Sequence, residues 1–163
     1  MTPGNPDDAL MHRVAIEING ATIEAQIPAR LLLADFIRDK AGLTGTHLGC
    51  EHGVCGACTV QLDGEPMRSC LMFAVQAHGR SVRTVEGLSD GQLHPLQQAF
   101  KETYGLQCGF CTPGFLMSLE PLLRERRRLS RDEIRHALSG NLCRCTGYQG
   151  IIAAVERAMS HES

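Results

Sequence analysis

Apolar and polar residues alternate along two short stretches near the beginning of the chain. Residues 13–18 and residues 21–27 both follow the period of two that is typical of a strand with one buried face. Asn19 and Gly20 lie between the stretches, and both residue types accept the positive φ of a two-residue hairpin turn. The pattern therefore predicts a β-hairpin over residues 13–27.

The rest of the first half combines one helical pattern with further strand patterns. Leu32, Phe36 and Ile37 would share one face of a helix, and Gly42 follows as a signal for its end. A second hairpin turn is expected at residues 63–64, which are Asp-Gly. The other expected segments are a helix over 31–40, a glycine-rich loop over 42–58, a strand over 59–62 and a short strand over 81–85.

The second half has the period of a helix. Thr112 and Pro113 suit the N-cap and the first position of a helix. Pro121 should kink or interrupt that same helix, and Ser130 with Glu133 forms the capping box of another. Helices are expected over 96–104, 112–127, 130–138 and 150–159. The change of period predicts a β-rich domain over residues 1–87 and a helical domain over residues 88–163.

Composition and charge exclude several functions. The 163 residues carry a net charge of −2, include only five Phe and two Tyr, and form no basic stripe, which argues against a nucleic-acid partner. Glycine and proline interrupt the longest uncharged run, residues 103–119, so no membrane span is expected. Residues 1–13 lack the apolar core of a Sec-type leader. We therefore expect a cytoplasmic protein, in which cysteines are more often metal ligands than disulfides.

Eight cysteines fall into two sets of four, one in each predicted domain. In the first cysteine set, three cysteines share one loop with the spacing C-x4-C-x2-C and the fourth follows later, which is typical of a plant-type [2Fe–2S] site. In the second cysteine set, a C-x2-C pair is followed much later by a C-x-C pair. The first cysteine set is Cys50, Cys55, Cys58 and Cys70, and the second is Cys108, Cys111, Cys143 and Cys145.

The residues around both sets suit an iron–sulfur cluster. Glycines at positions 45, 49, 53 and 56 allow the first loop to fold tightly and direct backbone N–H groups towards sulfur. Cys143 and Cys145 are two residues apart, so an extended segment would point both thiolates the same way. The turn from Cys108 to Cys111 precedes a predicted helix N-terminus, whose N–H groups favour thiolates.

Two other uses of the cysteines compete with this interpretation. A structural adaptor held by two zinc ions would typically use two C-x2–4-C pairs in each site, which neither set provides. A disulfide framework would fit a secreted chain better. Cys50-Glu51-His52 looks like half of a Rieske ligand pair, but no C-x2-H follows, so we interpret His52 as a loop residue. The chain shows no motif for substrate conversion of its own.

Three segments together resemble the iron–sulfur regions of the molybdenum hydroxylases, the xanthine oxidase family. Residues 49–60, GCEHGVCGACTV, resemble the first cluster loop of that family. Residues 107–114, QCGFCTPG, and residues 140–148, GNLCRCTGY, resemble the second. The short gap before Cys70 favours this family over a free-standing ferredoxin.

The resemblance implies a fold and a set of ligands. The fold would be α+β, with an N-terminal plant-type ferredoxin-like β-grasp domain followed by a C-terminal four-helix bundle. The second cysteine set would hold a [2Fe–2S] cluster proximal to molybdopterin, and the first set would hold a distal one. Gln107 and Cys145 match positions that approach the molybdopterin cofactor.

The resemblance also implies partners and a role. Electrons left at molybdenum by a hydroxylation would pass singly through the two clusters to FAD. The molybdopterin would belong to a large subunit and the FAD to a medium subunit, in a heterotrimer or a dimer of heterotrimers. The substrate would be an N-heteroaromatic or a related small molecule. The alternatives are the small subunit of an aerobic carbon monoxide dehydrogenase, that of an aldehyde or acyl-CoA oxidoreductase, and a soluble ferredoxin with free partners.

Overall fold

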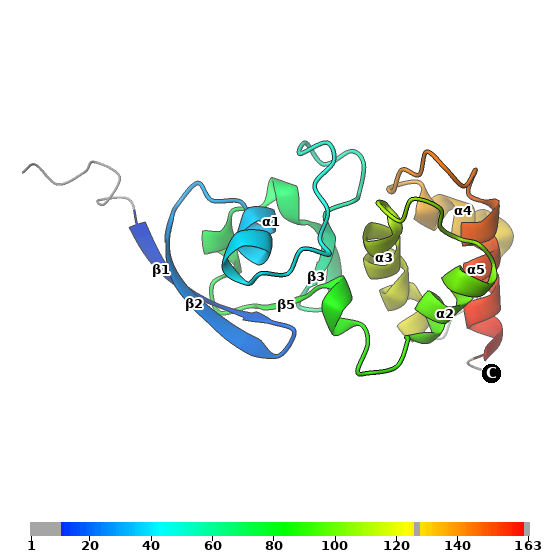
Figure 1. Ribbon diagram of the computed structural model, residues 1–163, viewed down its shortest axis with the longest axis horizontal. Coiled ribbons are helices and arrows are strands. Elements are labelled where there is room, and N and C mark those ends of the chain that lie inside the picture. The colour runs from blue at the N-terminus through cyan, green and yellow to red at the C-terminus, as the bar shows by residue number, and fades with distance from the viewer. Residues whose placement is uncertain (1–10, 126–127, 162–163) are drawn as a thin grey trace, which may run out of the picture.

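A five-stranded sheet and a group of helices lie side by side along the long axis of the protein (Figure 1). The computed structural model describes residues 11–125 and 128–161, so the end of the helix predicted over 112–127 lies outside the described residues. No helix in these two stretches is long and apolar enough to cross a membrane. A sheet followed by helices agrees with the predicted mixture of a ferredoxin-like part and a helical part.

The sheet has the strand order β2-β1-β5-β3-β4. β1 and β5 run parallel, whereas the other three neighbouring pairs are antiparallel. The last strand in sequence therefore lies between the two hairpins and joins them into one sheet. The strands are β1 (Met11–Ile18), β2 (Ala21–Pro28), β3 (Thr59–Leu62), β4 (Glu65–Arg68) and β5 (Ser81–Arg83).

Both predicted hairpin turns are confirmed. The register of β1 and β2 leaves Asn19, with φ +52°, and Gly20, with φ +84°, as the two loop residues. Asp63 and Gly64 join β3 to β4 in the same way, again with positive φ. The Asn-Gly and Asp-Gly pairs thus set the register of the hairpins, because few other residue pairs accept this backbone.

Two predicted elements of the first half differ in the structure. The expected helix over 31–40 is a short helix, α1 (Leu33–Asp35), that continues as one π-helical turn, η2 (Phe36–Lys40). It begins late because the backbone of Leu32 pairs with that of Phe73, and Leu33 rather than Leu32 enters the core. The strand expected over 81–85 ends at β5, because the N–H of Thr84 donates to Asn19 Oδ1 over 2.9 Å instead of continuing the ladder.

Three short 3₁₀ turns complete the first half. They are η3 (Ser69–Leu71), η4 (Ala74–Ala77) and η5 (Val85–Gly87). The core beneath them is formed by apolar residues that alternate along the strands and by the inner side of α1 and η2. Its largest fully buried members are Ile16, Ile27, Leu33, Phe36, Ile37 and Leu62.

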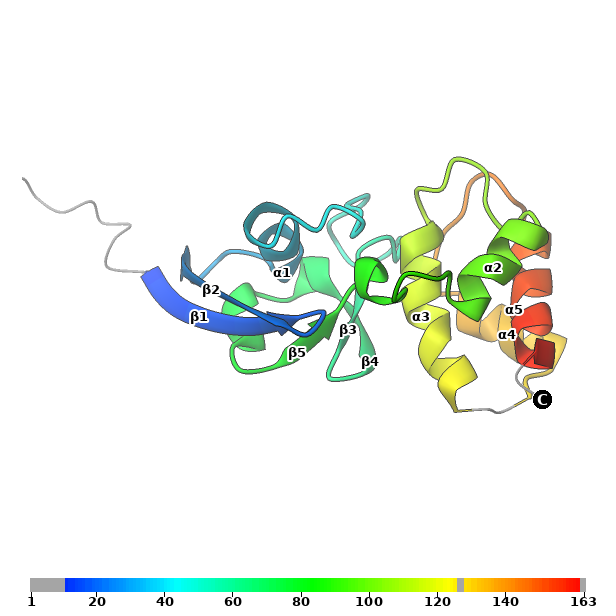
Figure 2. The same ribbon diagram turned by 60° about the horizontal axis from the view of Figure 1, so that its bottom comes forward.

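Four helices lie in the described part of the second half, and α3 lies nearest to the sheet in both views (Figures 1 and 2). All four were predicted, and their ends shift by no more than two residues where both predicted ends are described. The capping box at Ser130 and Glu133 is confirmed, since each side chain bonds the backbone N–H of the other residue. The helices are α2 (Pro95–Glu102), α3 (Thr112–Arg124), α4 (Arg131–Leu138) and α5 (Gln149–His161).

α3 differs from its prediction at two residues. Its N-cap is Cys111, not Thr112, because the Thr112 N–H already donates to Gly109 O within the preceding turn. Pro121 does not interrupt the helix. Proline lacks the N–H that would bond the carbonyl four residues earlier, and Gln61 Nε2 of β3 donates to that carbonyl, Met117 O, over 3.3 Å. The sheet therefore satisfies the backbone group that proline leaves open.

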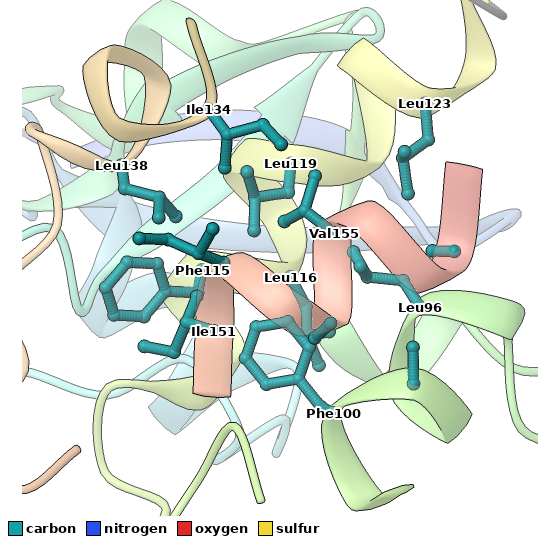
Figure 3. Packing of buried hydrophobic residues seen from close by; sticks show 14 of the residues in the cluster. Leu96, Phe100, Phe115, Leu116, Leu119, Leu123, Ile134, Leu138, Ile151 and Val155 are labelled. Atoms are coloured by element: carbon teal, nitrogen blue, oxygen red, sulfur yellow. The ribbon is translucent and has the colours of Figure 1, made fainter. Parts of the chain in front are cut away.

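The helices enclose a hydrophobic core separate from that of the sheet (Figure 3). Residues of α3 occupy its middle, and α2, α4 and α5 each turn one apolar stripe towards them, which is the packing that amphipathic helices require. The close view shows Leu96, Phe100, Phe115, Leu119, Ile134, Leu138, Ile151 and Val155 pointing towards one another.

Candidate functional site

The two cysteine sets lie in loops that face each other across the junction of the sheet and the helices. Three members of the first set lie in the loop between η2 and β3, which rises beside α3 (Figure 1), and the fourth, Cys70, lies in η3. The second set is divided between the turn before α3 and the segment between α4 and α5. All eight cysteines are free thiols.

The loop of the first set is held in shape by close backbone contacts. Gly53 has φ +83°, and a Cβ there would come within 2.4 Å of Leu71 Cδ1, beside Cys70. Gly56 has φ +75°, and a Cβ there would come within 2.6 Å of the Asn141 amide and of Gly140 O. The glycines of the loop therefore permit both its tight curvature and its approach to the helical half.

Two thiols of the first set have pKa values that shift in opposite directions. The Cys55 N–H points at Cys50 Sγ over 3.3 Å, and this contact together with the His52 N–H lowers the pKa of Cys50 to about 6. Burial and the adjacent Cys58 sulfur raise the pKa of Cys70 to about 11. Cys70 therefore ionises less readily than an ordinary thiol, and a cationic centre held by the set would favour its thiolate.

The second set brings together sulfurs from segments far apart in the sequence. Cys145 Sγ and Cys108 Sγ are 3.5 Å apart. Thr146 directs both its N–H, over 3.4 Å, and its hydroxyl, over 3.1 Å, at Cys143 Sγ. A pocket of about 500 Å³ opens here, and its lining includes all four cysteines of the set with Phe110, Leu142, Arg144 and Tyr148.

The thiols of the second set also differ in acidity. Burial first, and then the Cys143 sulfur, raise the pKa of Cys111 to about 12. Burial alone would raise the pKa of Cys143 as well, but the hydrogen bonds from Thr146 and the N–H of Cys145 bring it below its usual range. The N–H of Phe110 lowers the pKa of Cys108. Donors aimed at sulfur are the environment that thiolate ligands of iron–sulfur clusters require.

The donor chemistry of both sets fits a two-iron cluster, because N–H and hydroxyl donors point at the sulfurs of Cys50 and Cys143. A [2Fe–2S] cluster requires only two thiolates on each of its irons, together with donors to sulfur.

The loops of the two sets touch directly. The Leu142 N–H donates to Cys55 O over 2.9 Å, so the residue before Cys143 bonds to a member of the first set. Asn141 is buried, and its Nδ2 donates to Gly56 O over 3.0 Å. One route between the sets therefore runs from Cys55 through this hydrogen bond to Leu142 and on to Cys143.

Several residues that shape the site were not singled out from the sequence. Tyr148 accepts from the Cys143 N–H over 3.0 Å and donates to Asn141 O over 3.2 Å, which braces the loop of the second set. Arg68, at the end of β4, donates to Gly140 O and to the hydroxyl of Thr59. Asn141 and Tyr148 lie within the motif at 140–148, which is the only signal that could have marked them.

The structure locates His52 and the residues that the resemblance places near the pterin. His52 Nδ1 lies against the carbonyl oxygen of Cys50, over 2.5 Å, within its own loop. Gln107, Cys108 and Cys145 are all exposed at one edge of the helical half. The residues expected to face a pterin are therefore accessible to another molecule.

Comparisons with known proteins agree with this chemistry. A family model described as "2Fe-2S iron-sulfur cluster binding domain" matches residues 16–84, and one described as "[2Fe-2S] binding domain" matches residues 84–156. Together with the two cysteine sets, these matches define an iron–sulfur protein with two [2Fe–2S]-binding regions. The chain belongs to the xanthine oxidase family of molybdenum hydroxylases, as a small iron–sulfur subunit that transfers electrons.

Three similar proteins show how far the likeness extends. The gamma subunit of caffeine dehydrogenase from Pseudomonas sp. (strain CBB1) is 61% identical over 149 residues, which cover 89% of each chain. The small subunit of nicotine 6-hydroxylase from Paenarthrobacter nicotinovorans is 55% identical and covers 95% of this chain and 93% of its own. A chain of the solved quinoline 2-oxidoreductase from Pseudomonas putida 86 superposes with a TM-score of 0.89 at 51% identity, covering 93% of this chain and 95% of its own.

Proposed function

We propose that this subunit carries single electrons from a molybdopterin cofactor on one partner subunit to FAD on another. The second cysteine set would hold the [2Fe–2S] cluster proximal to the pterin, and the first set would hold the distal cluster. The observation that carries the proposal is the direct contact between the sets, the hydrogen bond from Leu142 to Cys55 O. A short connection of this kind is what stepwise electron transfer between two centres needs.

The proposal divides the chain into two domains with different tasks. Residues 1–87 would form the ferredoxin-like β-grasp domain, and residues 88–163 would form a four-helix bundle. Two separate hydrophobic cores support this division. Each domain would then keep its own cluster in a rigid frame, while the close packing at Gly56 and Asn141 would fix the spacing between the clusters.

The chemistry supplied by the clusters is the uptake and release of one electron each. The residues of this chain would tune that exchange. The N–H groups directed at Cys50 and the two donors of Thr146 directed at Cys143 offset negative charge on the thiolates, which favours the reduced state. Burial of Cys58 and Cys70 disfavours the reduced state of the first cluster, because a low dielectric disfavours added negative charge.

Exposed apolar residues beside each set support two docking surfaces. Val54, 57% exposed, and Leu71, 62% exposed, flank the first set, where we place the FAD-binding medium subunit. Leu142, 53% exposed, flanks the second set near Gln107 and Cys145, where we place the large molybdopterin subunit. Large apolar side chains exposed beside a functional site are typical of subunit interfaces. The assembly would be a heterotrimer or a dimer of heterotrimers, in a compartment that keeps thiols reduced.

We further propose that the complete enzyme hydroxylates an N-heteroaromatic compound. The relatives at 51–61% identity include proteins named for caffeine, nicotine and quinoline, all of which contain a nitrogen heteroaromatic ring. A second candidate is aldehyde oxidation, because the iron–sulfur subunit of aldehyde oxidoreductase PaoA from Escherichia coli is 39% identical over 161 residues. The higher identities favour the first candidate.

Purification of the chain with its partner subunits tests the proposal. We expect about four iron atoms and about four sulfides per chain, two of each per cluster, and two distinct EPR signals after reduction. Turnover with N-heteroaromatic compounds and with aldehydes, using a dye as acceptor, then separates the two candidate substrates. Zinc in place of iron, or the absence of acid-labile sulfide, would contradict the electron-transfer role.

A further inference from the structure

Phe110 connects the two cysteine loops in a way that ligation by cysteine does not require. It lies between Cys108 and Cys111, yet its ring stacks on His47 of the first loop, with 4.9 Å between ring centroids and an angle of 18°. His47 Nδ1 lies 2.7 Å from Phe110 O. A carbonyl oxygen only accepts, so Nδ1 carries the hydrogen and donates it. Ring and backbone of Phe110 are therefore both held by His47.

The ring of Phe110 also lies close to the first cysteine set. A Cβ placed on Gly49 would be 3.4 Å from Phe110 Cε1 and 3.1 Å from Cys55 Sγ. The ring edge and this sulfur therefore lie on either side of the space above Gly49, with the Ala57 side chain also near it. A residue from the turn of the second set thus lies near a sulfur of the first set.

The exposure of Phe110 indicates what the ring does there. It is 47% exposed, so part of the ring meets solvent while the rest covers His47 and Gly49. The bond from Leu142 to Cys55 O crosses the same junction between the loops. The ring therefore covers part of the surface beside this junction. Solvent access is one of the factors that set the reduction potential of an iron–sulfur cluster.

We propose that Phe110, held by His47, is a positioning residue for electron exchange between the two clusters. It seals the junction of the two loops against water and fixes their spacing. In the exchange, one electron would leave a reduced cluster held by the second set and enter an oxidised cluster held by the first set, without breaking a bond or moving a proton. This inference rests on the proposed function.

Removal of the ring has a defined consequence under this proposal. Water that enters the junction would donate hydrogen bonds towards sulfur and stabilise the reduced, more negative state of the nearby cluster. The reduction potential of the cluster in the first set should therefore rise. The magnetic interaction between the two reduced clusters should weaken as the loops lose their fixed spacing.

The test uses the full chain carrying both clusters, titrated with reductant and followed by EPR. Phe110→Ala should shift the potential of the first set upward and weaken the interaction between the clusters. Phe110→Leu, which keeps apolar volume, should give a smaller change in the same direction and still fold. Phe110→Tyr, which keeps the stacked ring, should match the unaltered chain. Leu93→Ala is the matched control, because Leu93 is 53% exposed but lies beside Pro95 and Arg157.

Each other outcome overturns the proposal in a recognisable way. Unchanged potentials and an unchanged interaction in Phe110→Ala would show that the ring does not seal the junction. Loss of partner binding with both EPR properties intact would make Phe110 an interface residue instead. An unaltered chain that lacks two separate cluster signals would remove the proposed function itself, and the inference with it.

Discussion

The side-chain amide of Asn141 donates a hydrogen bond to the carbonyl oxygen of Gly56, 85 positions earlier in the chain, over 3.0 Å. This contact joins the two loops that carry cysteines, because Gly56 directly follows Cys55 and Asn141 lies two residues before Cys143. Ser118 Oγ donates to Asn141 Oδ1 over 3.0 Å, so both ends of the buried amide are satisfied. One buried side chain therefore joins the first cysteine loop, α3 and the second cysteine loop.

Replacement of Asn141 by Ala should destabilise the protein. The change removes one buried hydrogen bond to the Gly56 carbonyl, which still accepts from the N–H and the hydroxyl of Thr59, so we expect a loss of about 0.5–1.5 kcal/mol. Urea unfolding followed by circular dichroism measures the loss. Ser118→Ala is the matched control, since the Asn141 bond to Gly56 would survive, and it should cost less. Equal losses for the two variants would show that the amide is not the principal fastening.

Substitution at Gly56 should be far more damaging than substitution at Gly20. Both residues have positive φ, so Ala at either site is strained by about 1–2 kcal/mol. A Cβ at Gly20 would meet nothing within 4 Å, whereas at Gly56 it would meet the Asn141 amide and Gly140 O at 2.6 Å. Gly56→Ala should therefore lower the iron content of the first set as well as the stability, which metal analysis and thermal unfolding would show. Similar effects at both positions would mean that backbone strain alone matters.

The local features of the fold could be predicted from the sequence, and the long-range ones could not. Asn19-Gly20 predicted its hairpin because the turn chemistry is contained in two residues. The prediction that Leu32 lies on the inner face of a helix was wrong, because Leu32 pairs with Phe73, which is 41 positions away in the sequence. The uninterrupted helix at Pro121 also depends on a distant residue, because Gln61 of β3 donates to the Met117 carbonyl that the proline leaves without its helical donor.

The candidate site shows the same division. The spacing of the cysteines indicated two sets, because ligand spacing within a loop is local. The contacts between the sets, such as those of Phe110 and Asn141, arise only when the helices pack on the sheet. No periodicity or spacing within either half carries that information.

The buried carboxylate of Glu120 should contribute measurably to the attachment of the helices to the sheet. It accepts from Gln61 Nε2 over 2.8 Å and pairs with Arg83 over 3.1 Å. Glu120→Ala leaves Gln61 with fewer partners in a buried position, where its Oε1 already has none, and should cost about 1–3 kcal/mol. Because the Arg83 side chain is 36% exposed, solvent screens the ion pair and most of the loss should come from the hydrogen bond.

A double-mutant cycle separates the two contributions of Glu120. Glu120→Gln keeps a hydrogen-bonding side chain and removes the charge, so it should cost less than Glu120→Ala in urea unfolding. Arg13→Ala is the control for an exposed ion pair, since Arg13 and Glu24 are 2.7 Å apart on the surface, and it should change stability little. If Glu120→Gln instead lowers the free energy of unfolding strongly, and this loss disappears when Arg83 is also replaced by Met, then the contribution of Glu120 comes from its charge.

Replacement of one thiol should remove one cluster and leave the other. Cys108 belongs to the second set, and its sulfur contacts Cys145 Sγ at 3.5 Å. Cys108→Ser should abolish the EPR signal of the second set and electron transfer from the molybdenum subunit. The signal of the first set should persist, because the sheet has a hydrophobic core of its own.

Cys58→Ser is the reciprocal variant, since Cys58 is buried in the first set and its loss should remove the other signal. Iron content should fall by about half in each variant, since each cluster holds two irons. Loss of both signals in either variant would show that the clusters assemble as one cooperative unit across the contact between Leu142 and Cys55, which would contradict the proposed division into two domains.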